Sequence, residues 1–180
     1  MRTSALVLFA AAALGAVAAH AQWGGWDADF DDDKKPWKEI EAKIPSYPKE
    51  GNLAPFDAGG TSPHRYFIDA QSLSIGEDGV VRYSLVVKTG GGATNVTFEG
   101  IRCDTREQKY YALGQANGSW TRARNPQWRR IEYREVNKHH FVLLKGILCT
   151  SAVSGATPVT SVKEAVRHLK DGPPSMTGPD

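Results

Sequence analysis

The sequence predicts an α+β domain: a mainly antiparallel β-sheet, curved or forming a partly open barrel, with a C-terminal amphipathic helix packed on it. Three observations lead to this fold class. From His64 onward, apolar and polar residues alternate with a period of two over several short runs, as they do in strands. Turn-forming pairs such as Asp78-Gly79 and Asn117-Gly118 separate these runs. A helical pattern begins near Ser161, close to the end of the chain.

The first 21 residues have the layout of a secretory signal peptide. Arg2 gives a positive start, Ala5 to Ala19 form an apolar stretch, and Ala19-His20-Ala21 matches the small-x-small cleavage pattern. This apolar stretch is shorter than the ~20 residues that a membrane-spanning helix needs. We therefore expect cleavage after Ala21 and a mature chain without a transmembrane segment. The expected location is the periplasm, with association with the outer membrane or secretion as alternatives.

Residues 22–43 are expected to form an acidic, flexible lead. The first part of this lead is rich in Gly and Asp and has no apolar period, which is typical of segments that do not fold on their own. A short helix is expected from Pro36, because Trp37, Ile40 and Ile44 would then share one face.

Residues 44–171 are expected to form a single domain whose strands follow one another with short turns between them. In the clearest strand, Val81, Tyr83, Leu85 and Val87 share one face, while the opposite face is mixed. Short strands with little helix between them favour an antiparallel sheet. The expected strands cover residues 73–75, 80–88, 95–103, 109–113, 119–122, 128–134 and 139–149.

The end of the domain predicts the helix. Ser161 and Glu164 match a capping box, in which the two side chains accept hydrogen bonds from unpaired amides at the start of a helix. A narrow apolar stripe at helical spacing follows and should pack on the sheet. The stripe consists of Val162, Ala165, Val166 and Leu169. Gly172 and two prolines end the helix, and residues 172–180 are expected to be a disordered tail.

The mature chain keeps two cysteines, Cys103 and Cys149. Exported proteins mature where disulfides form and persist, and an even count fits a single bridge. The alternative is a thiol enzyme, in which one cysteine is the nucleophile and a histidine is its base. The candidate bases are His64, His139 and His140. Neither cysteine lies in a sequence signature of such an enzyme, so the disulfide is the prediction.

One basic segment, residues 119–134, is the candidate binding surface. Bases outnumber acids in residues 102–145, whereas acids outnumber bases in residues 22–50. Arginine binds phosphate or carboxylate through two parallel hydrogen bonds, and indoles add stacking contacts. The candidate residues are Trp120, Arg122, Arg124, Trp128, Arg129, Arg130 and Arg134. The alternative is a solvated strand whose arginines pair with nearby acids and whose tryptophans are buried.

No motif in the sequence indicates a cofactor or a metal. His139 and His140 are adjacent, so in the expected strand they would point to opposite faces and could not hold one ion together. The run Gly90-Gly91-Gly92 follows a strand but lacks the rest of a phosphate-binding loop. The sequence contains neither the HExxH zinc motif nor the GxSxG motif of serine hydrolases.

Four stretches resemble the cryptic neisserial protein-like family of exported bacterial proteins. They are IPSYPKEGNLAPF at 44–56, FIDAQSLSIGEDGVVRYSLVV at 67–87, NVTFEGIRC at 95–103, and YALG at 111–114 followed by a tryptophan. The resemblance implies a protein of the Gram-negative envelope and supplies no catalytic residues.

Together these features favour an exported, non-enzymatic protein that binds a partner or ligand. The expected partners are another envelope protein or an anionic lipid or glycan, whereas the inferred compartment argues against nucleic acid. Two alternatives stay open. One is an envelope enzyme of hydrolase or thiol type, with a site assembled from residues far apart in the chain. The other is a structural component of an envelope assembly.

Overall fold

The computed structural model describes residues 36–60, 62–134, 137–152 and 155–172. The described residues from Trp37 onward form one compact unit. The expected signal peptide, residues 22–35 of the expected lead and the tail after Gly172 lie outside the described residues. No helix in the described part is long and apolar enough to cross a membrane.

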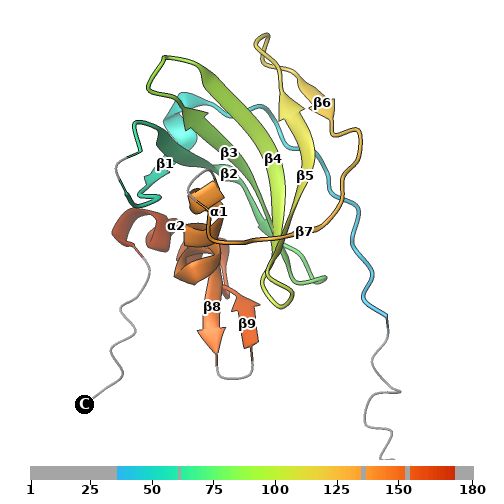
Figure 1. Ribbon diagram of the computed structural model, residues 1–180. Helices are drawn as coiled ribbons and strands as arrows, with labels where there is room; N and C mark the ends of the chain where they lie inside the picture. The colour runs from blue at the N-terminus through green and yellow to red at the C-terminus, as the bar shows by residue number, and fades with distance from the viewer. Residues whose placement is uncertain (1–35, 61, 135–136, 153–154, 173–180) are drawn as a thin grey trace, which may run out of the picture. The chain divides into compact units, whose positions relative to one another are not determined.

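An antiparallel sheet forms the centre of the fold, and six of its strands lie side by side in chain order (Figure 1). They are β1 (Leu53–Phe56), β2 (Arg65–Ile75), β3 (Val80–Lys88), β4 (Thr94–Arg102), β5 (Glu107–Gly114) and β6 (Trp120–Arg122). A seventh, β7 (Arg129–Arg130), also pairs with β5. Strands β1 and β6 are at the two ends of this order, so the sheet is open and does not close into a barrel. The predicted fold class is confirmed.

The central strands follow the predicted alternation closely. Strand β3 pairs with β4 without interruption, from Val80 opposite Arg102 to Lys88 opposite Thr94. Between β2 and β3, Gly79 has φ +75°, a left-handed conformation that glycine adopts without strain. The predicted hairpin turn at Asp78-Gly79 is therefore confirmed, and it joins β2 to β3.

A β-bulge interrupts the pairing of β4 with β5. Phe98 lies opposite Ala112 and Glu99 lies opposite Tyr110, so Tyr111 is an extra residue in β5. The neighbouring residues Tyr110 and Tyr111 point to opposite faces of the sheet, as successive strand residues do. Tyr110 contacts His140 on one face, whereas Tyr111 contacts Phe98 and Trp128 on the other.

Helices cover one face of the sheet, called the helix face below (Figure 1). The chain passes from α1 (Lys138–Val142) through a π-helical turn, η3 (Leu143–Ile147), into the two-stranded β8 (Cys149–Ala152) and β9 (Gly155–Pro158), and then into α2 (Val162–Asp171). The predicted strand over residues 139–149 is therefore wrong. An apolar run of this length fits a buried helix as well as a strand, and here Leu143 and Leu144 of η3 are buried in the core. Of the strand expected over residues 128–134, only Arg129–Arg130 forms.

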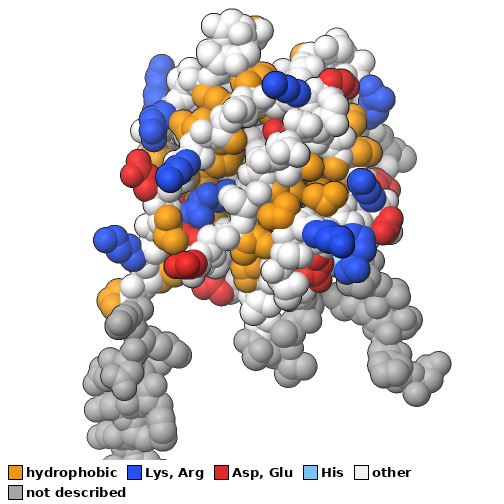
Figure 2. Space-filling model, turned by 180° about the vertical axis from the view of Figure 1, so that it is seen from behind, with side chains coloured by type: hydrophobic (Ala, Val, Ile, Leu, Met, Phe, Trp, Pro, Cys, Tyr) orange, Lys and Arg blue, Asp and Glu red, His pale blue; other side chains and the backbone are white. Residues whose placement is uncertain are grey.

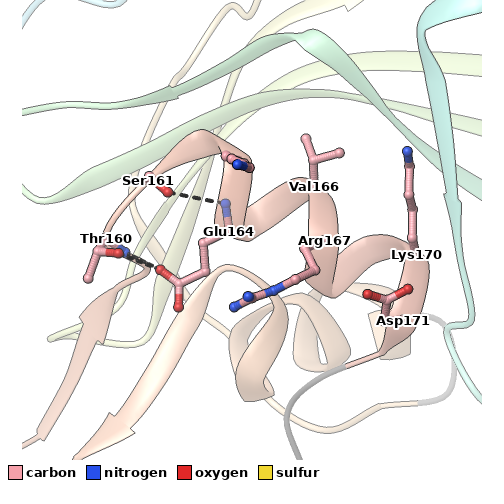
Figure 3. Close-up of a pocket in the computed structure, with 8 residues that line it drawn as sticks. Thr160, Ser161, Glu164, Val166, Arg167, Lys170 and Asp171 are labelled. Carbon is pink, nitrogen blue, oxygen red and sulfur yellow. Dashed lines mark hydrogen bonds between the residues drawn. The ribbon is translucent and has the colours of Figure 1, made fainter.

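The C-terminal helix α2 is confirmed, and its first turn has a cap (Figure 3). The Glu164 amide donates to the Ser161 hydroxyl oxygen at 3.2 Å. The carboxylate of Glu164 accepts hydrogen bonds from the amide and hydroxyl of Thr160, one residue before the position that a capping box uses. Gly172, with φ +83°, follows the last helical residue. Ala165 and Leu169 are buried and anchor α2 in the core.

The apolar core lies between the helix face and the helices. Its fully buried members include Ile68, Tyr83 and Ile101 from the sheet and Leu143 and Leu148 from the opposite layer. The predicted disulfide is confirmed: Cys103 and Cys149 form a bridge with an S–S distance of 1.99 Å. Both cysteines are completely buried. The bridge joins the end of β4 to the start of β8.

The opposite face of the sheet is covered by an extended segment, Trp37–Pro48, called the strap below; we call this side the strap face. Figure 1 shows this segment passing behind the sheet. The short helix expected from Pro36 is wrong, because the strap has no helical residue. Its side chains instead make contacts with strands that are far away in the sequence. A single turn of 3-10 helix, η1 (Glu50–Asn52), connects the strap to β1.

Candidate functional site

The predicted arginines lie where β6, β7 and the loop between them meet β5. Arg122, Arg124, Arg129 and Arg130 are exposed, and none of the four has an ion-pair partner among the described residues. Arg134 differs, because its guanidinium binds the carboxylate of Glu132 at 2.6 Å. The first four residues form what we call the arginine surface.

The arginine surface extends along β5 and around its edge. Arg130 lies opposite Glu107 and Arg129 lies opposite Gln108, so these two neighbours point to opposite faces of the sheet. Arg122 lies near the other end of β5. The arginines are therefore spread along a strand rather than gathered around one point.

Trp120 belongs to the packing of the strap. Its ring contacts Tyr47 at 5.2 Å and Phe98 at 6.4 Å between ring centroids. Its indole N–H donates to the carbonyl oxygen of Pro45 at 2.9 Å. Trp128 is likewise half-buried under the strap. The structure thus separates the predicted set: the tryptophans hold the strap, and the arginines face solvent.

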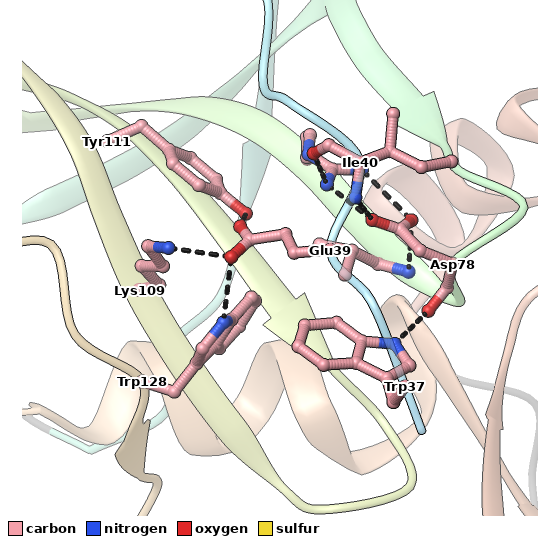
Figure 4. A network of polar contacts seen from close by, with 9 residues as sticks. Trp37, Glu39, Ile40, Asp78, Lys109, Tyr111 and Trp128 are labelled. Carbon is pink, nitrogen blue, oxygen red and sulfur yellow. Dashed lines mark hydrogen bonds and ion pairs between the residues drawn. The ribbon is translucent and has the colours of Figure 1, made fainter. Parts of the chain in front are cut away.

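Three donors, two from β5 and one from the loop just before β7, surround the carboxylate of Glu39, a strap residue (Figure 4). Lys109 Nζ lies 2.7 Å away, Tyr111 donates its hydroxyl at 2.8 Å, and Trp128 donates its indole N–H at 3.2 Å. We call Lys109, Tyr111 and Trp128 the carboxylate pocket. Burial alone would raise the pKa of Glu39, but the hydrogen bonds from Lys109 and Tyr111 hold it below its usual value. The pocket therefore binds an ionised carboxylate.

A second set of contacts binds the main chain of the strap. The Ile40 amide donates to Asp78 Oδ2 at 2.8 Å, and Arg82 Nη2 donates to the Ile40 carbonyl at 2.8 Å. Asp78 and Arg82 form a bidentate pair of their own, at 2.6 and 3.1 Å. Burial favours a raised pKa for Asp78, and the hydrogen bonds from Arg82 and Ile40 lower it overall. Trp37 adds an indole hydrogen bond of 2.8 Å to the Asp78 carbonyl.

Cations and aromatic rings alternate beneath the strap. The Arg102 guanidinium lies 3.6 Å from the centroid of the Trp37 ring and 5.8 Å from that of Trp128. Gly100 allows a close approach in the middle of β4. A Cβ at this position would lie 2.8 Å from the Tyr111 hydroxyl, so any larger residue would displace that ring. The missing side chain at Gly100 is therefore part of how Tyr111 reaches Glu39.

A buried polar cluster lies on the helix face, around Glu99. This carboxylate is completely buried and accepts hydrogen bonds from Thr97 at 2.5 Å, Tyr83 at 3.1 Å and His140 Nε2 at 2.7 Å. Since an ionised carboxylate only accepts, Nε2 carries the proton in this contact. Burial opposes the charge on Glu99, but His140 and the hydrogen bonds lower the pKa of the carboxyl below its ordinary value. Burial and the nearby carboxylate raise the pKa of Tyr83 well above its usual range.

His139 lies beside this cluster in a less polar setting. Its ring stacks on Tyr66 at 5.1 Å and lies 4.1 Å from the ring of His140. Burial, followed by the neighbouring His140, lowers the pKa of His139 to about 4. The two histidines were expected on opposite faces of a strand. They instead lie in α1, where both rings meet the sheet or its tyrosines.

The described residues contain no group of three or more His, Cys, Asp or Glu side chains that could hold a metal ion. Both cysteines are in the disulfide, so the bridged protein has no thiolate for the thiol-enzyme alternative. Seen from behind, the surface has hydrophobic patches across its middle, with most Lys and Arg side chains lying singly around them (Figure 2).

These features define a class of protein: a small, disulfide-bridged α+β domain whose open sheet is covered by helices on one face and by an extended strap on the other. The chain belongs to the CNP1-like family, whose family model matches residues 32–170. This match includes the strap and all of α2 except its last residue. No curated protein and no solved structure matches the chain.

Proposed function

We propose that the protein is an exported, non-enzymatic binding protein of the bacterial envelope, and that its arginine surface holds an anionic partner. The observation that carries this proposal is the exposure of Arg122, Arg124, Arg129 and Arg130 without an ion-pair partner among the described residues. Exposed guanidiniums that no carboxylate neutralises keep their full capacity for bidentate binding of phosphate or carboxylate.

The spacing of the arginines suggests the form of the partner. The residues that pair with Arg122 and Arg130, Ala112 and Glu107, are separated along β5 by a distance on the order of 15 Å at the usual rise per strand residue. Guanidiniums this far apart suit several anionic groups on one surface or chain better than one small anion. An anionic lipid surface, an acidic glycan or an acidic face of another protein has this character.

Two further features support export. The N-terminal sequence has the layout of a signal peptide, and a disulfide of this kind persists in oxidising compartments such as the periplasm. The periplasmic location is part of the proposal.

Vesicle binding tests the proposal. The purified chain is mixed with phosphatidylcholine vesicles that either contain or lack phosphatidylglycerol, and bound protein is measured by co-sedimentation over a range of salt concentrations. Binding should require the anionic lipid and weaken steeply with salt, because exposed charges are screened. A soluble acidic polysaccharide, alginate, used as a competitor distinguishes a lipid partner from a glycan.

A charge-matched pair of variants locates the site. Replacing Arg129 and Arg130 by Ala should reduce binding to the preferred anion about tenfold or more. Replacing Lys163 and Arg167 by Ala removes the same charge from α2, far along the chain, and should have little effect. An equal loss in both variants would reject the arginine surface as the site. No binding of the native chain to vesicles or polysaccharide would exclude lipid and glycan as its partners.

A further inference from the structure

The strap covers the sheet without joining it. Its main chain forms no backbone-to-backbone hydrogen bond with any described strand. A segment that belonged to the sheet would continue the ladder of main-chain hydrogen bonds. Side chains of the sheet hold the strap instead, in the way that a groove holds a bound peptide.

Some of these contacts would accept almost any extended chain. Arg82 and Asp78 bind the carbonyl and the amide of Ile40, and Trp120 binds the carbonyl of Pro45. All three bind main-chain atoms. They therefore recognise an extended backbone and place little demand on the side chains of the segment that lies there.

Two other contacts depend on the sequence of the segment. The carboxylate pocket surrounds the Glu39 carboxylate with one cation and two neutral donors. Two residues earlier, the Trp37 ring stacks against the Arg102 guanidinium at 3.6 Å. The pattern that fits this groove is an aromatic residue followed, two positions later, by a carboxylate.

The strap fills the groove only in part. A cavity of about 300 Å³ lies between the strap and the loop after β6, lined by Glu39 and Ile44 on one side and Arg122 and Pro126 on the other. The Trp37 and Ile40 side chains are 40 % and 46 % exposed. Three polar atoms beneath the strap are buried without a hydrogen-bond partner. They are Nε of Arg82, Nε of Arg102 and the hydroxyl of Ser84.

We infer that the groove beneath the strap is a peptide-binding site and that the strap is its resident occupant. The partner is an extended segment of another protein that carries an aromatic residue two positions before a carboxylate, and it binds when the strap leaves. This inference concerns the strap face and does not depend on the arginine surface.

Competition by the strap controls access to the groove. A short tether keeps the strap at an effective concentration in the millimolar range, so a free peptide of the same sequence binds the native chain weakly. Weakening the contacts of the strap raises the fraction of open groove, and the apparent affinity for a free peptide rises by the same factor.

The experiment uses the full chain and a fluorescein-labelled peptide with the sequence of residues 36–47, PWKEIEAKIPSY. Binding is measured by fluorescence anisotropy. The chain variant Trp37→Ala with Glu39→Gln should bind the peptide at least tenfold more tightly than the native chain. A peptide carrying the change Glu39→Gln should bind that variant at least tenfold more weakly, because it leaves Lys109 without a counter-charge.

A matched control removes the same charge from the strap elsewhere. Glu41 is exposed and makes no polar contact among the described residues, so the chain variant Glu41→Gln should bind like the native chain. Near-UV circular dichroism shows whether each variant keeps the native packing. If a folded double variant binds the peptide no better than the native chain, or binds the Glu39→Gln peptide equally well, the inference is wrong.

A measurement on the native chain covers the case in which the double variant does not fold. Hydrogen exchange is followed at the Ile40 amide, which is bonded to Asp78. A saturating, millimolar concentration of the unlabelled peptide should speed exchange at this amide, because the peptide displaces the strap. Unchanged exchange at that concentration would overturn the inference, and the Glu39→Gln peptide at the same concentration should speed exchange less than the native peptide does.

Discussion

The two faces of the sheet are covered by different physical means. The helix face is closed by apolar side chains, a buried disulfide and a carboxylate with three donors. The strap face is closed by one extended segment that hydrogen bonds and stacked rings hold in place. Burial of apolar area is the main stabilising force in folding, whereas hydrogen bonds add little net stability each. The helix face should therefore determine whether the domain folds, and the strap face should open while the rest stays folded.

The largest effect is expected from the disulfide. Replacing both Cys103 and Cys149 by Ala removes a link between residues 46 apart in the sequence. Loop-closure entropy then predicts a loss of about 4 kcal/mol in the free energy of unfolding. Urea denaturation followed by far-UV circular dichroism measures this loss. A loss below about 1 kcal/mol would show that the apolar contacts of the helix face hold the layers together unaided.

Next in size is the buried pair on the helix face. His140→Leu leaves the Glu99 carboxylate without one of its three donors in a fully buried site, and the free energy of unfolding should fall by roughly 3 kcal/mol. The double variant with Glu99→Leu is the control. Because it removes the charge as well, it should be more stable than His140→Leu alone. Equal losses in both variants would mean that the charge on Glu99 plays no part.

A pH dependence should follow from His139. Its pKa in the folded protein is about 4, against 6.5 for an exposed histidine, so below pH 6.5 the unfolded chain binds a proton that the folded chain does not. Stability should therefore fall by about 2 kcal/mol as the pH drops from 6.5 to about 4. Urea denaturation across this range measures the slope.

The variant His139→Phe keeps an aromatic ring beside Tyr66 and should remove this slope. The variant should still lose stability at lower pH, because of a second group, Glu99. The pKa of Glu99 is depressed in the folded state, so its contribution is present above the ordinary value of 4.5 and is lost as the pH falls through the lower folded value. If His139→Phe keeps the full slope above pH 4.5, His139 is not its source.

The smallest effect is expected on the strap face. Trp120→Phe removes the indole hydrogen bond to the Pro45 carbonyl and keeps most of the ring packing on Tyr47. The free energy of unfolding should fall by only about 1 kcal/mol. Hydrogen exchange of the strap amides should nevertheless increase, while exchange in β3 and β4 stays slow. A uniform increase across the whole domain would show that the two faces open together.

The sheet was predictable because its signals are local. The alternation in residues 80–88 and the pair Asp78-Gly79 define a strand and a hairpin within a few residues of chain. The capping pair Ser161 and Glu164 identifies α2 in the same way. The disulfide followed from the number of cysteines together with the inferred compartment.

The strap and its contacts were not predictable, because they depend on residues far apart in the sequence. Glu39 is bound by Lys109 and by Trp128, which lie 70 and 89 residues away. The spacing of Trp37 and Ile40 in the sequence suggested a helix. Contacts with the sheet, which the sequence does not show, hold this segment extended instead. The sequence did contain a signal for Glu99, because this charged residue shares a strand face with the apolar Ile101. That mismatch could have indicated a buried carboxylate.

The extra residue in β5, Tyr111, determines how that strand would respond to the loss of one residue. Tyr111 has no partner of its own in β4, and it reaches Glu39 on one face while the preceding Tyr110 reaches His140 on the other. A deletion of Tyr111 would restore a regular ladder, with Tyr110 and Ala112 still opposite Glu99 and Phe98, and would remove the hydroxyl that donates to Glu39. The strap face can therefore lose this contact through a shortened strand while the pairs that face the helices stay in place.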